Sequence, residues 1–257
     1  MIFELLYALF MGLLQGLTEW LPISSSGHLV LAQHFYAISE RTLFDAILHL
    51  GTFFAALVYF RKDIKPLLNI KNSLTHKIIL ASIPIIIIGV LISEIIEVAF
   101  AFAIIAAILL IINGFVLLTN AFFEFPGRKK KSKKESKITF KQALIIGIFQ
   151  IFALFPGISR SGTTITTGRA LGLDWKRAAK FSFFISFIPI AGAAGFKIAT
   201  DWHEFEPFYI IGFIAAFIVG YATIDIMMRI LQLGKFHYFG FYSIMIGVGM
   251  LILMTII

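Results

Sequence analysis

The sequence has no cysteine and few charged residues. The absence of cysteine excludes disulfide bonds, thiolate catalysis and metal sites with cysteine ligands. Charged residues make up 14% of the chain and hydrophobic residues 59%, whereas soluble domains have about 25% and about 45–50%. A water-soluble fold of this composition would expose too much apolar surface. The sequence therefore predicts an integral membrane protein.

The sequence also lacks the period-two alternation of membrane barrel strands. Instead, several uncharged stretches approach or exceed the roughly 20 residues that a helix needs to cross a bilayer. The apolar stretches are 2–14, 43–60, 77–96, 98–123, 141–155, 178–198, 207–232 and 239–257, with shorter amphipathic pieces at 28–39 and 163–172. An all-α bundle is predicted. The first residues have no basic stretch or cleavage site and are predicted to be mature structure, not a signal peptide.

Two of these stretches are too short to span easily, and each runs into a break rich in proline, glycine and serine. The stretch 2–14 leads to LPISSSGH at 21–28, and 141–155 leads to FPGISRSGT at 155–163. Each is predicted to form half of a re-entrant hairpin, in which a helix enters the bilayer, breaks and returns on the same side. Such irregular backbone is tolerated where protein or a water-filled cavity surrounds it.

The two breaks belong to an internal repeat. With a shift of 135 residues, eight of the twenty positions 8–27 carry identical residues. The identical pairs are Ala8/Ala143, Leu9/Leu144, Gly12/Gly147, Gln15/Gln150, Ile23/Ile158, Ser24/Ser159, Ser26/Ser161 and Gly27/Gly162. We predict a first repeat at 1–123, a basic loop at 124–141 and a second repeat at 142–257. Each repeat would hold one re-entrant hairpin and three transmembrane helices, six in all, and an odd number of spans inverts the second copy.

The distribution of charge predicts the orientation. The segments that this topology assigns to one side carry 18 of the 22 basic residues, eight of them in the run from Arg128 to Lys141. The other side carries Arg41 and Lys197 among seven acidic residues. The positive-inside rule places the basic loop in the cytoplasm, so the net charge of +8 is assigned to anionic lipid and not to nucleic acid. The first hairpin then enters from outside and the second from inside, and their polar tips meet.

The tips carry the candidate functional residues, because polar and charged groups at membrane depth are costly and mark functional sites. The first tip supplies Gln15, Glu19, Ser24, Ser25, Ser26 and His28, and the second supplies Ser159, Arg160, Ser161, Thr163 and Thr164. Glu19 aligns with Leu154 and Ser25 with Arg160, so the carboxylate comes from one repeat and the guanidinium from the other. One composite site is predicted.

This set of side chains suits phosphate chemistry. Arg160, hydroxyls and free backbone N–H groups match phosphate oxygens. His28 can transfer a proton, and a neighbouring serine can act as a nucleophile. Gln15 and Glu19 share a helical face, where they could hold Mg²⁺ or Ca²⁺. Metal-assisted phosphoryl transfer fits all of these groups.

Structural roles compete with each of these assignments. Ser26 and Ser161 could satisfy the backbone of a broken helix, His28 could be structural, and Glu19 with Arg160 could form only a buried salt bridge. Two further polar pairs are expected to be structural. These pairs are Asp45 with His49, and Asp225 with Arg229.

The runs QGLTEWLPISSSGHL at 15–29 and PGISRSGTT at 156–164 closely resemble the two signature motifs of the undecaprenyl-pyrophosphate phosphatase family, the bacitracin-resistance type. The resemblance extends to FDAILHLGT at 44–52 and FSFFISFIP at 181–189 and covers nearly the whole chain. It implies removal of one phosphate from a polyprenyl pyrophosphate at the outer face of the plasma membrane, with dependence on a divalent cation.

The resemblance also assigns roles to residues. It implies that Glu19, Ser25, His28 and Arg160 are catalytic, that Ser24, Ser26, Ser159, Ser161 and Thr164 contact phosphate, and that Gln15 and Glu19 hold the cation. Gln15 stands where many members have an acid. Ser243, in FGFYSIM at 239–245, stands where members often have arginine.

The sequence thus predicts an all-α integral membrane phosphatase that recycles a glycan carrier lipid. Its fold would have six transmembrane helices and two re-entrant hairpins in an inverted-topology repeat. The alternative is a lipid-carrier or small-anion transporter, which also uses inverted repeats around a midplane site. The predicted partners are the polyprenyl pyrophosphate lipid and the bilayer. The nucleophile (Ser25, His28 or water), the prenyl chain length and the oligomeric state, a homodimer included, are left open.

Overall fold

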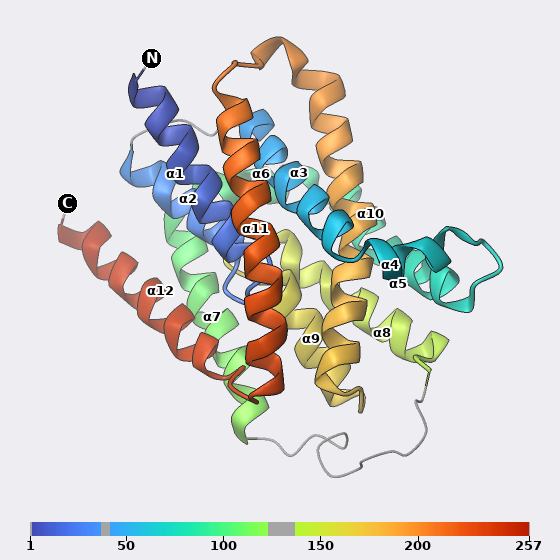
Figure 1. Cartoon of the computed structure of the whole chain (residues 1–257). Coiled ribbons are helices and arrows are strands. Elements are labelled where there is room, and N and C mark those ends of the chain that lie inside the picture. The colour runs from blue at the N-terminus through green and yellow to red at the C-terminus, as the bar shows by residue number, and fades with distance from the viewer. Residues whose placement is uncertain (1, 37–41, 123–136, 257) are drawn as a thin grey trace.

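A computed structural model describes residues 2–36, 42–122 and 137–256. Within these ranges the chain consists of helices and connecting turns (Figure 1). The first half contains α1 (Ile2–Thr18), α2 (Ser25–Phe35), α3 (Thr42–Tyr59), α4 (Arg61–Ile64), the 3₁₀ helix η1 (Lys65–Leu68), α5 (Ser73–Leu91), α6 (Ser93–Ala101) and α7 (Ala103–Phe122). The second half contains α8 (Phe140–Gln150), η3 (Ile151–Leu154), α9 (Arg160–Ala170), α10 (Trp175–Asp201), η4 (Trp202–Glu204), α11 (Tyr209–Gln232) and α12 (Tyr238–Ile256). Most of the predicted basic loop lies outside the described residues.

Six of these helices, α3, α5, α7, α10, α11 and α12, are long and apolar enough to cross a membrane. They match the six predicted spans, with two corrections. The stretch 77–96 is not one helix, because α5 ends at Leu91 and α6 starts anew at Ser93. The stretch 98–123 is not one helix either, because α6 ends at Ala101 and α7 starts at Ala103. Large apolar side chains such as Ile87, Phe115 and Ile218 are more than half exposed, as expected where helices face lipid tails. The chain is an all-α multi-pass membrane protein.

The short helices α1 and α8 each pack against a long helix of the other half of the chain. Helix α1 lies along α11, and α8 lies along α5 (Figure 1). The repeat-related glycines Gly12 and Gly147 mark these contacts. A Cβ atom on Gly12 would overlap the carbonyl oxygen of Gly212, and one on Gly147 would overlap that of Ala81. The two aligned glycines therefore each allow a short helix to approach a long helix closely. The inverted orientation of the repeats stays a prediction.

The two breaks in the helices lie against each other. Ser24 adopts a left-handed backbone conformation, with φ of 66°. Its hydroxyl accepts hydrogen bonds from the N–H groups of Gly27 and Gly157 at 3.3 and 3.1 Å. Gly157, in the second break, has φ of 102° and leaves no space for a Cβ beside α7. In return, Ser161 donates to the carbonyl oxygen of Leu21 at 3.1 Å. The two polar tips are therefore in contact, as predicted, while their re-entrant course through a membrane stays a prediction.

Asn113, on α7, joins both breaks to the long helices. Its side-chain amide donates to the carbonyl oxygen of Pro22 at 3.0 Å and to the hydroxyl of Ser243 at 3.2 Å. Its oxygen accepts the N–H of Ser159 at 3.0 Å. Asn113 is fully buried, so it supplies the partners that broken backbone needs away from water. Ser243 thereby has a structural role, and α12 contributes to the support of the breaks.

Trp20 anchors the first break to the core. Its ring is 1% exposed and meets Phe183 edge to face, with ring centroids 5.1 Å apart. Phe60 also packs against Phe183, with ring centroids 5.5 Å apart. Because Trp20 follows Glu19 directly, this anchor fixes the backbone from which Glu19 projects.

Close packing at Gly147 makes a testable prediction. Gly147→Ala should destabilise the protein by about 1–3 kcal/mol, the usual cost of overpacking, because the added methyl group meets the backbone of α5. The melting temperature in detergent should fall by several degrees. Gly249→Ala is the matched control, since Gly249 lies on α12 with nothing within 4 Å of its Cβ position, and there a helix former should be neutral or stabilising. Equal melting temperatures for all three proteins would contradict the close approach of α8 and α5.

Candidate active site

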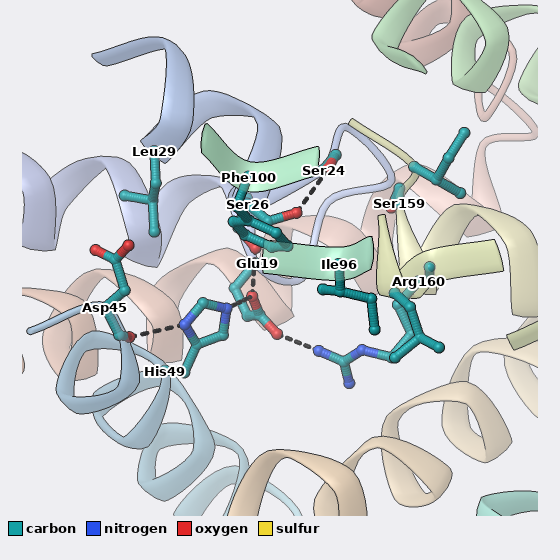
Figure 2. A pocket seen from close by; sticks show the side chains of 14 residues that line it. Glu19, Ser24, Ser26, Leu29, Asp45, His49, Ile96, Phe100, Ser159 and Arg160 are labelled. Atoms are coloured by element: carbon teal, nitrogen blue, oxygen red, sulfur yellow. Dashed lines mark hydrogen bonds and ion pairs between the residues drawn. The ribbon is translucent and has the colours of Figure 1, made fainter. Parts of the chain in front are cut away.

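The carboxylate of Glu19 is the centre of a polar cluster where the two breaks meet (Figure 2). Its side chain is 1% exposed. The guanidinium of Arg160 donates to Oε1. The hydroxyl of Ser25 donates to Oε2 at 2.5 Å, and the amide of Gln15 donates to the same oxygen at 3.0 Å. A buried carboxylate requires such partners, and here they come from both halves of the chain.

Three helix ends hold these groups. Gln15 and Glu19 are one turn apart at the end of α1, so they share a face. Ser25 is the first residue of α2, and Arg160 is the first residue of α9. The starts of α2 and α9 are capped by Ser24 and Ser159, whose hydroxyls accept N–H groups of Gly27 and Gly162 at 3.3 and 3.0 Å. The positive ends of two helices therefore point at one place, which favours an anion there.

A cavity of about 250 Å³ opens beside the cluster. Its polar wall consists of Glu19, Ser24, Ser25, Ser26, Asp45, His49, Ser159 and Arg160. Apolar side chains, among them Leu29, Ile96 and Phe100, complete it (Figure 2). Hydroxyls, a carboxylate and a guanidinium thus face one small space, where they can bind and transfer a phosphoryl group.

The other predicted phosphate-contacting residues divide into two groups. Ser24, Ser26 and Ser159 line the cavity. Ser161 is turned to the backbone of Leu21. Thr164 donates to the carbonyl oxygen of Arg160 at 2.7 Å and lies 2.6 Å from the hydroxyl of Ser182. These last two residues do not line the cavity, and their contacts hold the two breaks and α10 together.

His28 also lies away from the cavity. Its Nδ1 is 2.8 Å from the carbonyl oxygen of Ser24, and its Nε2 is 3.0 Å from the hydroxyl of Tyr242. A carbonyl only accepts, so Nδ1 carries a proton, and in the neutral ring Nε2 accepts from the tyrosine. The two rings are stacked at 8°. In this geometry His28 secures the strained turn at Ser24, and its predicted role in proton transfer is not supported by any contact with Ser25 or Glu19.

His49 is a site residue that the sequence reasoning missed. We expected Asp45 and His49 to be structural, but both line the cavity. His49 donates from Nδ1 to the carbonyl oxygen of Asp45 at 2.8 Å, which turns Nε2 toward Glu19 Oε2 at 3.6 Å. Gln33 donates to both carboxylate oxygens of Asp45 at 2.9 Å. The signal was present, since Asp45 and His49 lie one turn apart in the third resembling run, FDAILHLGT. Asp225 and Arg229 pair with each other at 2.8 Å, as predicted.

The donor set bears on the predicted divalent cation. Among the described residues, no three His, Asp or Glu side chains gather as a metal cage. Gln15 is fully buried, and its side-chain amide donates a hydrogen bond to the carboxylate of Glu19. Gln15 is therefore a hydrogen-bond partner of Glu19 and not a ligand that faces the cavity. Glu19 and Asp45 do face it. One or two carboxylates fit a cation that arrives bound to phosphate oxygens, which is how Mg²⁺ is commonly held.

An apolar groove of about 230 Å³ adjoins the polar cavity. It shares His49, Ala153 and Arg160 with that cavity. Its remaining wall consists of one cation, Lys197, and of small and apolar residues, which are Ala46, Ile85, Pro189, Ile190, Ala193 and Ala194. The site therefore offers a charged compartment and a mainly apolar compartment, and Arg160 lines both.

Comparison with known proteins gives matches over most of the chain. Residues 8–249 match the family described as bacitracin resistance protein BacA. The chain is 40% identical to the undecaprenyl-diphosphatase of Caldicellulosiruptor bescii over 249 residues, which cover 91% of this chain and 92% of that protein. It is 34% identical to the undecaprenyl-diphosphatase of Methanosphaera stadtmanae, with 99% of both chains covered. A match of this extent includes both breaks and all six long helices, and the chain therefore belongs to the bacitracin resistance protein BacA family.

Proposed function

We propose that this protein hydrolyses a polyprenyl pyrophosphate to the monophosphate and phosphate. The observation that carries the proposal is the pair of compartments that meet at Arg160. The polar cavity suits a pyrophosphate, and the adjoining apolar groove suits the first part of a prenyl chain. The relatives that match nearly the whole chain are named undecaprenyl-diphosphatases, which supports the same substrate class. None of these names supports the transporter alternative, and we do not propose it.

Ser25 is the nucleophile in this proposal. Its hydroxyl already donates to Glu19, so the carboxylate can accept its proton as the oxygen attacks the terminal phosphorus. The bond from that phosphorus to the bridging oxygen breaks, and the polyprenyl monophosphate leaves. Water then attacks the phosphoserine, which releases phosphate and restores the Ser25 hydroxyl.

Arg160 and the two helix starts stabilise the charge that develops on the phosphoryl oxygens. The guanidinium has five N–H donors, and its bond to Glu19 leaves others for phosphate. The backbone N–H groups at the starts of α2 and α9 add partial positive charge. Preorganised donors of this kind commonly supply the largest part of catalysis.

The proposal includes a divalent cation that binds together with the pyrophosphate. When bound, it neutralises part of the pyrophosphate charge. Glu19 would hold it, with Asp45 at the far wall of the same cavity. Gln15 would act through Glu19 by keeping the carboxylate in place.

We also propose the orientation in the plasma membrane. The basic segments around Lys62, Lys71 and Lys176 would face the cytoplasm by the positive-inside rule. The acidic segment from Asp201 to Glu206 would face outside, and the active site would open to the outer face.

The first test measures phosphate release from a polyprenyl pyrophosphate by purified protein in detergent. Wild type should release phosphate without a second compartment. Arg160→Lys should lose about a hundredfold or more in kcat/KM, because an ammonium cannot reproduce the paired hydrogen bonds of the planar guanidinium. Arg229→Lys, in an exposed pair away from the site, is the control and should match wild type. No phosphate release by folded wild type would refute the proposed function.

A second prediction separates Glu19 from His28. Glu19→Gln should abolish turnover, since the amide cannot take the proton of Ser25, whereas His28→Gln should retain measurable turnover with a lower melting temperature. Both variants are compared with wild type by phosphate release, after a melting curve establishes that each is folded. Equal loss in the two variants would show that His28 takes part in the chemistry.

The same assay tests the cation. Wild type treated with EDTA should lose activity and regain it with Mg²⁺ or Ca²⁺, and Gln15→Glu should need less cation because it adds negative charge beside Glu19. Full wild-type activity in EDTA would remove the cation from the proposal.

The orientation can be tested because the chain has no cysteine of its own. Asn69→Cys and His203→Cys place single thiols at exposed positions on the two predicted sides. In intact cells, a membrane-impermeant maleimide should label His203→Cys and spare Asn69→Cys, while both should react after permeabilisation. The opposite pattern would reverse the topology.

A further inference from the structure

A second cavity, of about 430 Å³, lies where α5, α8 and α10 begin. It shares no lining residue with the active-site cavity. Four cations line it: Lys77 on α5, Lys137 just before α8, and Arg177 and Lys180 on α10. None of these residues takes part in the chemistry proposed above.

Two of these cations are balanced by acids and two are not. Lys180 pairs with Asp63 at 2.5 Å, and Arg177 pairs with Asp174 at 3.1 Å. Lys77 and Lys137 have no acidic partner among the residues that the structure describes. The cavity wall therefore carries excess positive charge.

Lys77 is the most informative of the four. The residue is only 7% exposed. Its ammonium lies 5.0 Å from the centre of the Phe140 ring, and this cation–π contact offsets part of the cost of burial. A buried charge is otherwise expensive without an ion of opposite sign. A buried cation in a cavity wall without an acid is what a bound anion would complement.

The first turn of α5 favours the same kind of ligand. Asn72 caps the helix by accepting the N–H of Leu74 at 2.9 Å, and Asn72 and Ser73 both line the cavity. The start of the helix adds partial positive charge beside Lys77. Hydroxyl, amide, ammonium and guanidinium groups together match the oxygens of a phosphate.

The rest of the wall is apolar. Leu74, Ile138, Phe181 and Phe184 line the cavity beside the cations. Cations next to apolar walls between membrane helices suit an amphiphile, with a phosphate head group and hydrocarbon attached to it. We propose that this cavity is a second phosphate-binding site that takes the phosphate head group of an anionic lipid. A free phosphate ion shares the same oxyanion chemistry, and the test distinguishes the two sources.

The experiment measures the melting temperature of the full chain with three probes. These probes are nanodiscs of phosphatidylcholine alone, nanodiscs of phosphatidylcholine mixed with phosphatidylglycerol, and inorganic phosphate added to the first. Phosphatidylglycerol should raise the melting temperature of wild type. Lys77→Met should need at least about tenfold more phosphatidylglycerol for the same shift, the usual effect of removing one charged hydrogen-bond donor.

Lys176→Met is the matched control. Lys176 is exposed, neighbours Arg177 and lies outside the cavity wall. The substitution Lys176→Met therefore removes the same charge as Lys77→Met but should leave the response of wild type unchanged. If Lys77→Met does not fold, the exposed Lys137→Met replaces it. A response of the cavity variant equal to that of Lys176→Met would overturn the proposal, because general surface charge would then explain the effect.

Two further measurements identify the ligand and separate this site from the active site. A shift produced equally by inorganic phosphate and lost in Lys77→Met would support the site and assign it to the free ion. Phosphate release by Lys77→Met in phosphatidylcholine should equal that of wild type, which separates this site from the active site. Loss of phosphate release in folded Lys77→Met would overturn the independence of the two sites.

Discussion

The structure depends on the ion pair between Glu19 and Arg160. Each charge stands at a break in a helix, and neither half of the chain supplies a partner of opposite charge from within its own break. A charge buried in this way costs several kcal/mol unless it is paired and hydrogen-bonded. The pair therefore requires both breaks to be in contact, and the candidate active site exists only where the two halves are assembled. The same requirement keeps the site single although the sequence is repeated.

The contact between the breaks also solves a backbone problem. A helix that breaks inside a membrane protein leaves N–H and C=O groups that lipid cannot satisfy. Here each break satisfies the other, through Ser24 and the N–H of Gly157 in one direction and Ser161 and the carbonyl of Leu21 in the other. Asn113 hydrogen-bonds one backbone group of each break, the carbonyl of Pro22 and the N–H of Ser159. The serines of the two motifs thus have two roles: Ser25 and Ser26 line the cavity, Ser161 bonds the backbone, and Ser24 and Ser159 do both.

The overall arrangement of the helices was predictable from the lengths of the apolar stretches and from the internal repeat. Apolar stretches long enough to cross a bilayer gave the six spans, and the alignment of Gly12 with Gly147 gave the repeat, although the helix contacts at these glycines were not predicted. The places of His28 and His49 were not predictable in this way. Both histidines lie near the breaks in sequence or space, but which one faces the cavity depends on the rotation of α2 and α3 against their neighbours. Asn113 was missed for a related reason, because one amide in an apolar span gives no sign of its partners.

The ion pair also suggests how binding and proton transfer are connected. Without phosphate, Arg160 neutralises Glu19, and the carboxylate holds the Ser25 hydroxyl at 2.5 Å. A pyrophosphate in the cavity would compete for the guanidinium, because its oxygens accept the same paired hydrogen bonds. Oε1, the oxygen that Arg160 contacts, would then be open to the cation that accompanies the substrate, while Oε2 keeps the Ser25 hydroxyl. The residue proposed to bind the substrate would thereby free the proposed base, and Gln15 would keep that carboxylate aligned while its partners change.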